Sequence, residues 1–146
     1  MTRHGRKYTE AASLVEAERR YEEILKRDPR SGLAANNLAA IFIEQGQNYG
    51  YAEKLAGIAL EQLPAEAEVA DTVGSLHYRR ANYRTAIRFF QQAVALEPTN
   101  PLFHYRLGQA YVANAEPERA RGAFQSALRL NSGFAEARTA LSALGH

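Results

Sequence analysis

Four segments of the chain repeat one pattern of apolar and small positions. In the first, these residues stand at Ala17, Tyr21 and Ile24, and Pro29 closes the segment. The same spacing begins again at residues 52, 86 and 120, so that the copies are 35, 34 and 34 residues apart. Residues at such offsets share one face of an α-helix. A fixed period of this length is typical of stacked supersecondary units, which present an extended surface.

A second helix is predicted upstream of each segment. There, a small residue is followed three positions later by a larger one, in the pairs Gly5/Tyr8, Ala39/Phe42, Gly74/His77 and Gly108/Tyr111. Turn signals separate the two helices at Gly46, at Asn82 and at Asn114, because Gly and Asn tolerate the left-handed conformation that ends a helix. Pro117 suits the first position of the next helix. Each unit is therefore predicted to be a helix–turn–helix in which small residues allow close approach and aromatic rings fill the remaining space.

These features resemble the tetratricopeptide repeat. VGSLH and LGQAY match the first helix of that repeat, AIRFFQQA and ARGAFQSA match the second, and the resemblance covers nearly the whole chain. It implies an all-α fold, an α-solenoid of antiparallel helix pairs. We expect a single domain over residues 1–146, with repeats at about 1–31, 32–66, 67–100 and 101–134 and a capping helix at 135–144.

The first repeat departs from the pattern. Counted back from Pro29, Met1 falls part-way into the first helix of this repeat. We therefore expect a clipped first helix, either because that helix is abbreviated or because the chain is a piece of a longer array. At the other end, Phe134, Ala137 and Leu141 are expected to cover the last repeat, since an array needs a cap.

Charge is distributed unevenly. The chain has 18 Lys and Arg against 16 Asp and Glu, a net charge of +2. Residues 1–30 carry a net +2, residues 31–76 a net −5 and residues 77–146 a net +5. Nucleic-acid binding requires a continuous basic surface, and the acidic middle interrupts it. The contrast could orient a protein partner or favour head-to-tail self-association.

No pattern in the sequence predicts catalysis or a cofactor. The four histidines are scattered, there is no cysteine, and no His-Glu-x2-His metal motif occurs. There is also no glycine-rich phosphate loop and no serine in a nucleophile elbow. No stretch reaches the roughly 18 apolar residues that span a bilayer. The chain is therefore predicted not to be an enzyme, to need no cofactor or metal, and to have no membrane span.

The resemblance implies a concave groove lined by the first helices of the repeats, where partner segments usually bind. Asn side chains can hold an extended peptide backbone, Tyr gives contact area at low entropy cost, and Arg106 could pair with a carboxylate. The groove residues expected on these grounds are Asn36, Asn37, Ala40, Glu44, Asp71, Ser75, Tyr78, Arg79, Tyr105, Arg106 and Gln109.

One subgroup of the family grips the C-terminal carboxylate of chaperone tails with five Lys, Asn and Arg side chains. In either register, no more than two of those five positions match here, and Glu68 would repel the carboxylate. This activity is therefore not expected.

The leading interpretation is a non-catalytic protein–protein interaction module that binds a partner segment in the groove and serves as a scaffold. The alternative is a structural spacer or self-associating solenoid fragment, a possible homo-oligomer through its ends. RNA binding is disfavoured by the acidic middle. The sequence also resembles bacterial tetratricopeptide scaffolds, some of which belong to envelope systems for exopolysaccharide export. The lack of cysteine is compatible with any compartment, cytoplasmic or periplasmic.

Overall fold

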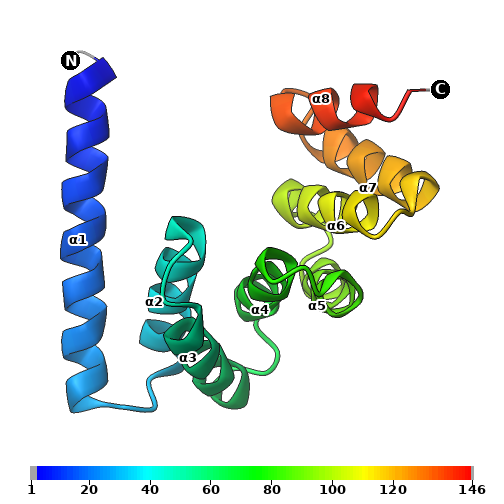
Figure 1. Ribbon diagram of the computed structural model, residues 1–146. Coiled ribbons are helices and arrows are strands. Elements are labelled where there is room, and N and C mark those ends of the chain that lie inside the picture. The colour runs from blue at the N-terminus through cyan, green and yellow to red at the C-terminus, as the bar shows by residue number, and fades with distance from the viewer. Residues whose placement is uncertain (1–2, 146) are drawn as a thin grey trace. The chain divides into compact units, whose positions relative to one another are not determined.

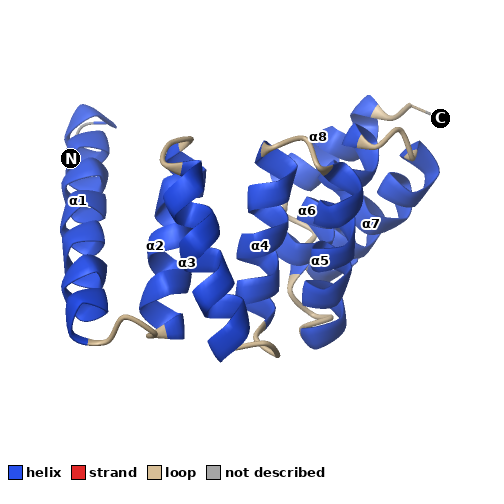
Figure 2. Cartoon of the chain, turned by 60° about the horizontal axis from the view of Figure 1, so that its bottom comes forward, coloured by secondary structure: helices blue, strands red, loops and turns tan. Residues whose placement is uncertain are grey.

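The structure is a computed structural model that describes the backbone of residues 3–145 and the side chains of residues 12–145. Within that range every regular element is an α-helix (Figure 2), so the predicted all-α class is confirmed. The helices are α1 (Arg3–Arg27), α2 (Gly32–Gln45), α3 (Tyr49–Gln62), α4 (Ala67–Arg79), α5 (Tyr83–Leu96), α6 (Pro101–Ala113), α7 (Pro117–Leu130) and α8 (Ala135–Ala143). They fall into two compact units, Met1–Pro64 and Ala65–His146, each described separately below.

The first unit contains α1 and the hairpin of α2 and α3 (Figure 1). Ser31 caps α2, because its hydroxyl accepts a hydrogen bond from the backbone N–H of Ala34 at 3.3 Å. Gly46 ends α2 with a left-handed φ of 72°, as the sequence predicts. Across the hairpin, the ring of Phe42 lies 5.6 Å from that of Tyr51. The buried face of α2 thereby meets α3.

The expected turn within residues 1–31 does not occur. Residues Arg3–Arg27 form one continuous helix of 25 residues instead of a clipped helix followed by a second one. The segment Thr9–Glu16 contains no Gly, Pro or Asn, and it is rich in good helix formers. Nothing in this segment therefore stops the helix. The pair Gly5/Tyr8 belongs to the part whose side chains lie outside the described residues.

The second unit consists of the hairpins α4–α5 and α6–α7, followed by α8. The predicted close approach of small and aromatic residues is confirmed here. A Cβ atom added to Gly74 would lie 2.7 Å from Phe90, and one added to Gly108 would lie 2.4 Å from Phe124. Both rings are almost fully buried. Each hairpin therefore closes with an aromatic ring from its second helix set into the space that a missing side chain leaves on its first.

The turns inside these two hairpins differ from the prediction in one respect. The left-handed residues are Ala81 (φ 62°) and Ala115 (φ 59°), not Asn82 and Asn114, whose φ angles are −91° and −90°. The N–H of Asn82 bonds the carbonyl of His77 at 2.8 Å, a six-residue closure that requires the residue before it to be left-handed. Asn82 thus lies one position beyond the left-handed residue.

The ends of the second-unit helices follow the sequence signals closely. Asn100 caps α6 by accepting the N–H of Leu102 at 3.0 Å, and Pro101 and Pro117 occupy the first positions of α6 and α7. The C-terminal helix α8 covers the last hairpin. Ala137 is fully buried, and Leu141 packs against the core formed by α5, α6 and α7. The predicted capping helix is therefore present.

Candidate partner-binding surface

The predicted groove residues lie on the first helix of each hairpin. Four of them are on α2 in the first unit, and seven are on α4 and α6 in the second. The second helices, α3, α5 and α7, contribute none. The two sets are considered in turn.

On α2 the four residues differ in how far they are exposed. Asn36 is only 5% exposed, and its Oδ1 accepts no hydrogen bond from any described residue. Asn37 and Ala40 are half-buried, whereas Glu44 is exposed near the end of the helix. Asn36 is thus a buried packing position, and Asn37 with Glu44 offers the polar groups that a partner could reach.

An ion pair joins α4 to α6. Nη1 of Arg106 donates a hydrogen bond to Oδ2 of Asp71, while Oδ1 of Asp71 is buried and accepts none from the described residues. Burial raises the pKa of Asp71 to about 6; Arg106 acts to lower this pKa, and the neighbouring carboxylate of Glu68 acts to raise it. The pair therefore sets the spacing of the two helices, and Arg106 is already engaged rather than free for a ligand.

The two tyrosines have one face on the core. Tyr105 has its ring 5.8 Å from Phe124 and 5.0 Å from Phe134, and its hydroxyl accepts a hydrogen bond from Nε2 of Gln109 at 3.1 Å. Tyr78 packs edge-on against Tyr83 at 5.6 Å. Both tyrosines remain half-buried rather than fully enclosed. Their positions are fixed by packing, and the remaining exposed part of each ring faces solvent.

The tyrosines and the ion pair share one electrostatic environment. Partial burial raises the pKa of Tyr105, and the charge of Glu136 and the proximity of Tyr78 add to this rise. Glu136, on α8, is exposed and was not among the predicted residues. The repeat register could have found it, because it lies 68 residues after Glu68 on α4, two periods of 34. The surface of the second unit thus extends from α4 over α6 to α8.

The remaining predicted residues of this unit are Ser75 and Arg79. Ser75 is half-buried, and Arg79 is exposed in the last turn of α4. Together with Gln109, they add neutral and cationic donors around the two tyrosines. The arrangement can make hydrogen bonds and aromatic contacts to a polypeptide, and it holds no nucleophile–base pair.

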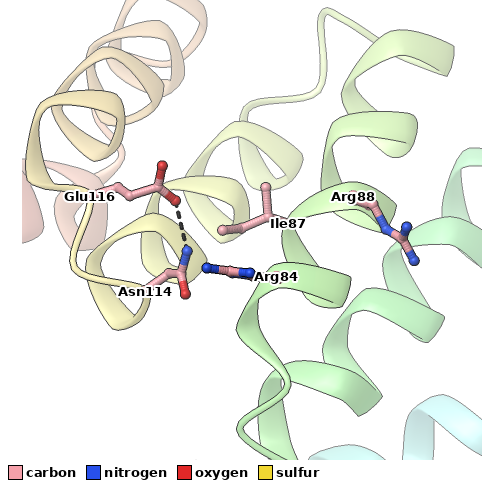
Figure 3. A pocket seen from close by; sticks show the side chains of 5 residues that line it. All are labelled: Arg84, Ile87, Arg88, Asn114 and Glu116. Atoms are coloured by element: carbon pink, nitrogen blue, oxygen red, sulfur yellow. Dashed lines mark hydrogen bonds between the residues drawn. The ribbon is translucent and has the colours of Figure 1, made fainter.

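A separate depression of about 480 Å³ lies elsewhere on the second unit (Figure 3). Arg84, Ile87 and Arg88 on α5 line it together with Asn114 and Glu116 from the turn between α6 and α7. Nδ2 of Asn114 donates to Oε2 of Glu116 at 2.8 Å, and Arg84 extends toward Asn114 while Arg88 points away. None of the predicted residues lines this depression, which is open and shallow.

Two further kinds of site were sought. Within the range that the structure describes, no three His, Cys, Asp or Glu side chains lie close enough together to hold a metal ion. Over the same range, none of the helices combines the length and the apolar character needed to cross a bilayer.

Residues 78–144 match the family model described as Tetratricopeptide repeat. The chain is a tetratricopeptide repeat protein. Two relatives carry similar sequence: a protein O-mannosyl-transferase of Caenorhabditis elegans, 32% identical over 51% of the chain, and a TPR repeat-containing thioredoxin of Arabidopsis thaliana, 28% identical over 66% of the chain. The chain spans only 11% and 15% of the length of these relatives.

Solved structures share the fold of this tetratricopeptide repeat protein. MamA superposes with a TM-score of 0.79 at 23% identity, covering 99% of the chain and 83% of MamA. PilF of Pseudomonas aeruginosa gives 0.81 at 23% identity, covering 96% of the chain and 64% of that structure. The first TPR of Spaghetti (RPAP3), bound to the HSP90 peptide SRMEEVD, gives 0.73 at 21% identity, covering 80% of the chain and 92% of that structure. These likenesses show the solenoid of helix pairs.

Proposed function

We propose that this tetratricopeptide repeat protein is a non-catalytic interaction module that binds an extended or helical segment of a protein partner. Repeat proteins of this kind are generally interaction modules. The binding surface we assign is formed by α2 in the first unit and by α4 and α6, continued by α8, in the second. The protein would act as a scaffold in a larger assembly.

The observation that carries this proposal is the set of half-exposed aromatic and polar side chains held in place on α4 and α6. Tyr105 is fixed between Phe124 and Phe134, and the pair of Asp71 and Arg106 holds the two helices together. A surface fixed in this way loses little conformational entropy when a ligand binds. Tyrosines of this kind supply large contact area with few rotatable bonds.

The solved structure of the RPAP3 domain with a bound peptide supports peptide binding by this fold. The chemistry of the ligand should nevertheless differ from that of a carboxylate clamp. Asp71 and Glu68 place acidic groups on α4, and Arg106 is paired with Asp71. We therefore expect a segment that offers backbone amides and neutral or basic side chains rather than a terminal carboxylate.

The test is a comparison of two double variants in the second unit, both tested as the full chain. Peptides selected from a displayed library against the unmodified protein would be measured against Arg79→Ala/Gln109→Ala and against Arg88→Ala/Gln125→Ala. Each variant removes one Arg and one Gln, and the second pair lies on α5 and α7, away from the proposed surface. We expect the first variant to raise the Kd at least tenfold, about 1.4 kcal/mol, and the second to leave it unchanged. Equal Kd values for both variants would place the binding site elsewhere.

A second function is supported by a different observation. Helix α1 carries several large apolar side chains that are exposed, among them Leu14 at 40%, Val15 at 65% and Ile24 at 44%. Exposed apolar side chains on one element are typical of surfaces that associate. We propose that the protein also self-associates, and that this occurs through the end of the array that α1 forms.

A further inference from the structure

Helix α1 exposes positions that are buried in the other repeats. The fixed spacing places Ala17, Tyr21 and Ile24 in the same register as Ala86/Phe90/Ala93 and Ala120/Phe124/Ala127. Those six residues are 0–2% exposed. Ala17 and Tyr21 are only half-buried, and Ile24 is exposed. Helix α1 therefore has the face of a second helix of a repeat, without the first helix that would cover it.

The sequence of the missing cover is present in the chain but is carried away from its target. In the two hairpins of the second unit, the small residue that faces the aromatic ring precedes it by 16 residues, as with Gly74 and Phe90. Gly5 precedes Tyr21 by the same 16 residues. Because α1 is continuous, with a rise of about 1.5 Å per residue, these two positions lie roughly 24 Å apart along it. One copy of α1 cannot fold onto itself while it remains one helix.

We propose that a second copy of the chain covers this face, with the two α1 helices antiparallel and residues 3–12 of each over residues 14–23 of the other. This inference rests on the self-association proposed above and names its surface. The pairing of position 5 with position 21 places the two-fold axis at residue 13. The contact is isologous, since each copy gives and receives the same segment. It is a domain swap in which the turn of one repeat is drawn out into a helix.

Charge supports the antiparallel arrangement. Residues 3–12 carry three Arg and Lys against one Glu, whereas residues 14–23 carry four Glu against two Arg. The antiparallel register places the basic segment of each copy over the acidic segment of the other. A parallel arrangement would place like segments together, which is unfavourable.

A depression on α1 lies where the second helix would rest. It has a volume of about 640 Å³, and its lining runs from Ala12 to Ile24 and includes Ser13, Ala17 and Tyr21. Val15 does not line it, although Val15 is more exposed than Ile24. The small residues Ala12, Ser13 and Ala17 would allow another helix to approach closely, as Gly74 and Gly108 do in the hairpins.

Size measurement by light scattering across a concentration series forms the first part of the test. A species of twice the 16.2 kDa chain mass supports self-association. A monomer at every concentration would overturn both the second function and this inference, and it would leave the peptide-binding proposal untouched.

The second part locates the interface by single cysteines, which the chain permits because it has none of its own. Ser13→Cys lies at the proposed two-fold axis, and Val15→Cys is the control two positions along the same helix. Mild oxidation should produce a disulfide-linked dimer from Ser13→Cys and several-fold less from Val15→Cys. A dimer in solution that shows no preference for position 13 would keep the second function and overturn the assignment to α1 in this register.

A matched pair of charge substitutions completes the experiment. Ile24→Arg should raise the dissociation constant of the dimer at least tenfold, whereas Val15→Arg should leave it nearly unchanged. Both replace an exposed apolar residue of the same helix by the same cation. If Val15→Arg weakened the dimer equally, association would follow general exposure of apolar surface, and the specific pairing would be wrong.

Discussion

Gly108 and Phe124 are in contact so close that no side chain would fit between them. A Cβ atom on Gly108 would lie 2.4 Å from Cε1 and 2.6 Å from Cδ1 of the ring. Gly74 and Phe90 repeat this relationship 34 residues earlier, at 2.7 Å and 2.8 Å. The ring of each second helix thus lies directly against the backbone of its first helix, and the absence of a side chain makes this possible.

Replacement of Gly108 by Ala should destabilise the second unit. The new methyl group would force the buried ring of Phe124 to move, and overpacking of this kind costs about 1–3 kcal/mol. Gly122→Ala in α7 is the matched control, because a Cβ atom there meets nothing within 4 Å. That substitution should raise stability by about 0.5–1 kcal/mol through helix propensity. Urea unfolding followed by circular dichroism measures both, and equal midpoints for the two variants would contradict the packing described.

The ion pair of Asp71 and Arg106 should make stability depend on pH. Burial raises the pKa of Asp71 to about 6, while an unperturbed Asp titrates near 3.9. Between these two values the folded chain holds a proton that the unfolded chain has released. The stabilisation is therefore fully present below about pH 4 and is lost as the pH rises through 6, by at most ~3 kcal/mol.

Asp71→Asn isolates this contribution, since the amide does not titrate. The free energy of unfolding of the parent should fall relative to that of Asp71→Asn as the pH rises from 4 to 7, measured by urea unfolding at each pH. Glu118→Gln, at an exposed position of α7, serves as the control and should follow the parent at every pH. Parallel curves for the parent and Asp71→Asn would show that Asp71 titrates normally.

Glycine at the left-handed turn positions should stabilise the protein. Ala81 and Ala115 have φ angles of 62° and 59°, a conformation that costs a non-glycine residue about 1–2 kcal/mol. Gly at either position removes this strain but adds flexibility to the unfolded chain, so that a net gain of about 0.5–1 kcal/mol is expected. Thermal melting measures the change. Ala95→Gly, within α5, is the control and should lower the melting temperature by a comparable amount; a lower value for Ala81→Gly as well would be inconsistent with a left-handed turn.

The sequence by itself determined the helix pairs and their contacts. The period of 34 residues placed Gly74 against Phe90 and Gly108 against Phe124 before any coordinate was known, because this spacing is short-range and recurs in register. Local signals also placed Gly46 at the end of α2 and Pro101 and Pro117 at the starts of α6 and α7. These features depend on residues that are close together along the chain.

Only the tertiary structure decided how the polar groove residues are used. The sequence offered Asp71 and Arg106 as separate groove positions, whereas 35 residues apart they form one pair that joins α4 to α6. Such a pairing depends on the distance between two repeats, which no local pattern encodes. The continuity of α1 was likewise missed, because the repeat register predicted a turn at residues where helix propensity provides none. Period fixes which faces can meet, and the course of the backbone fixes which of them do.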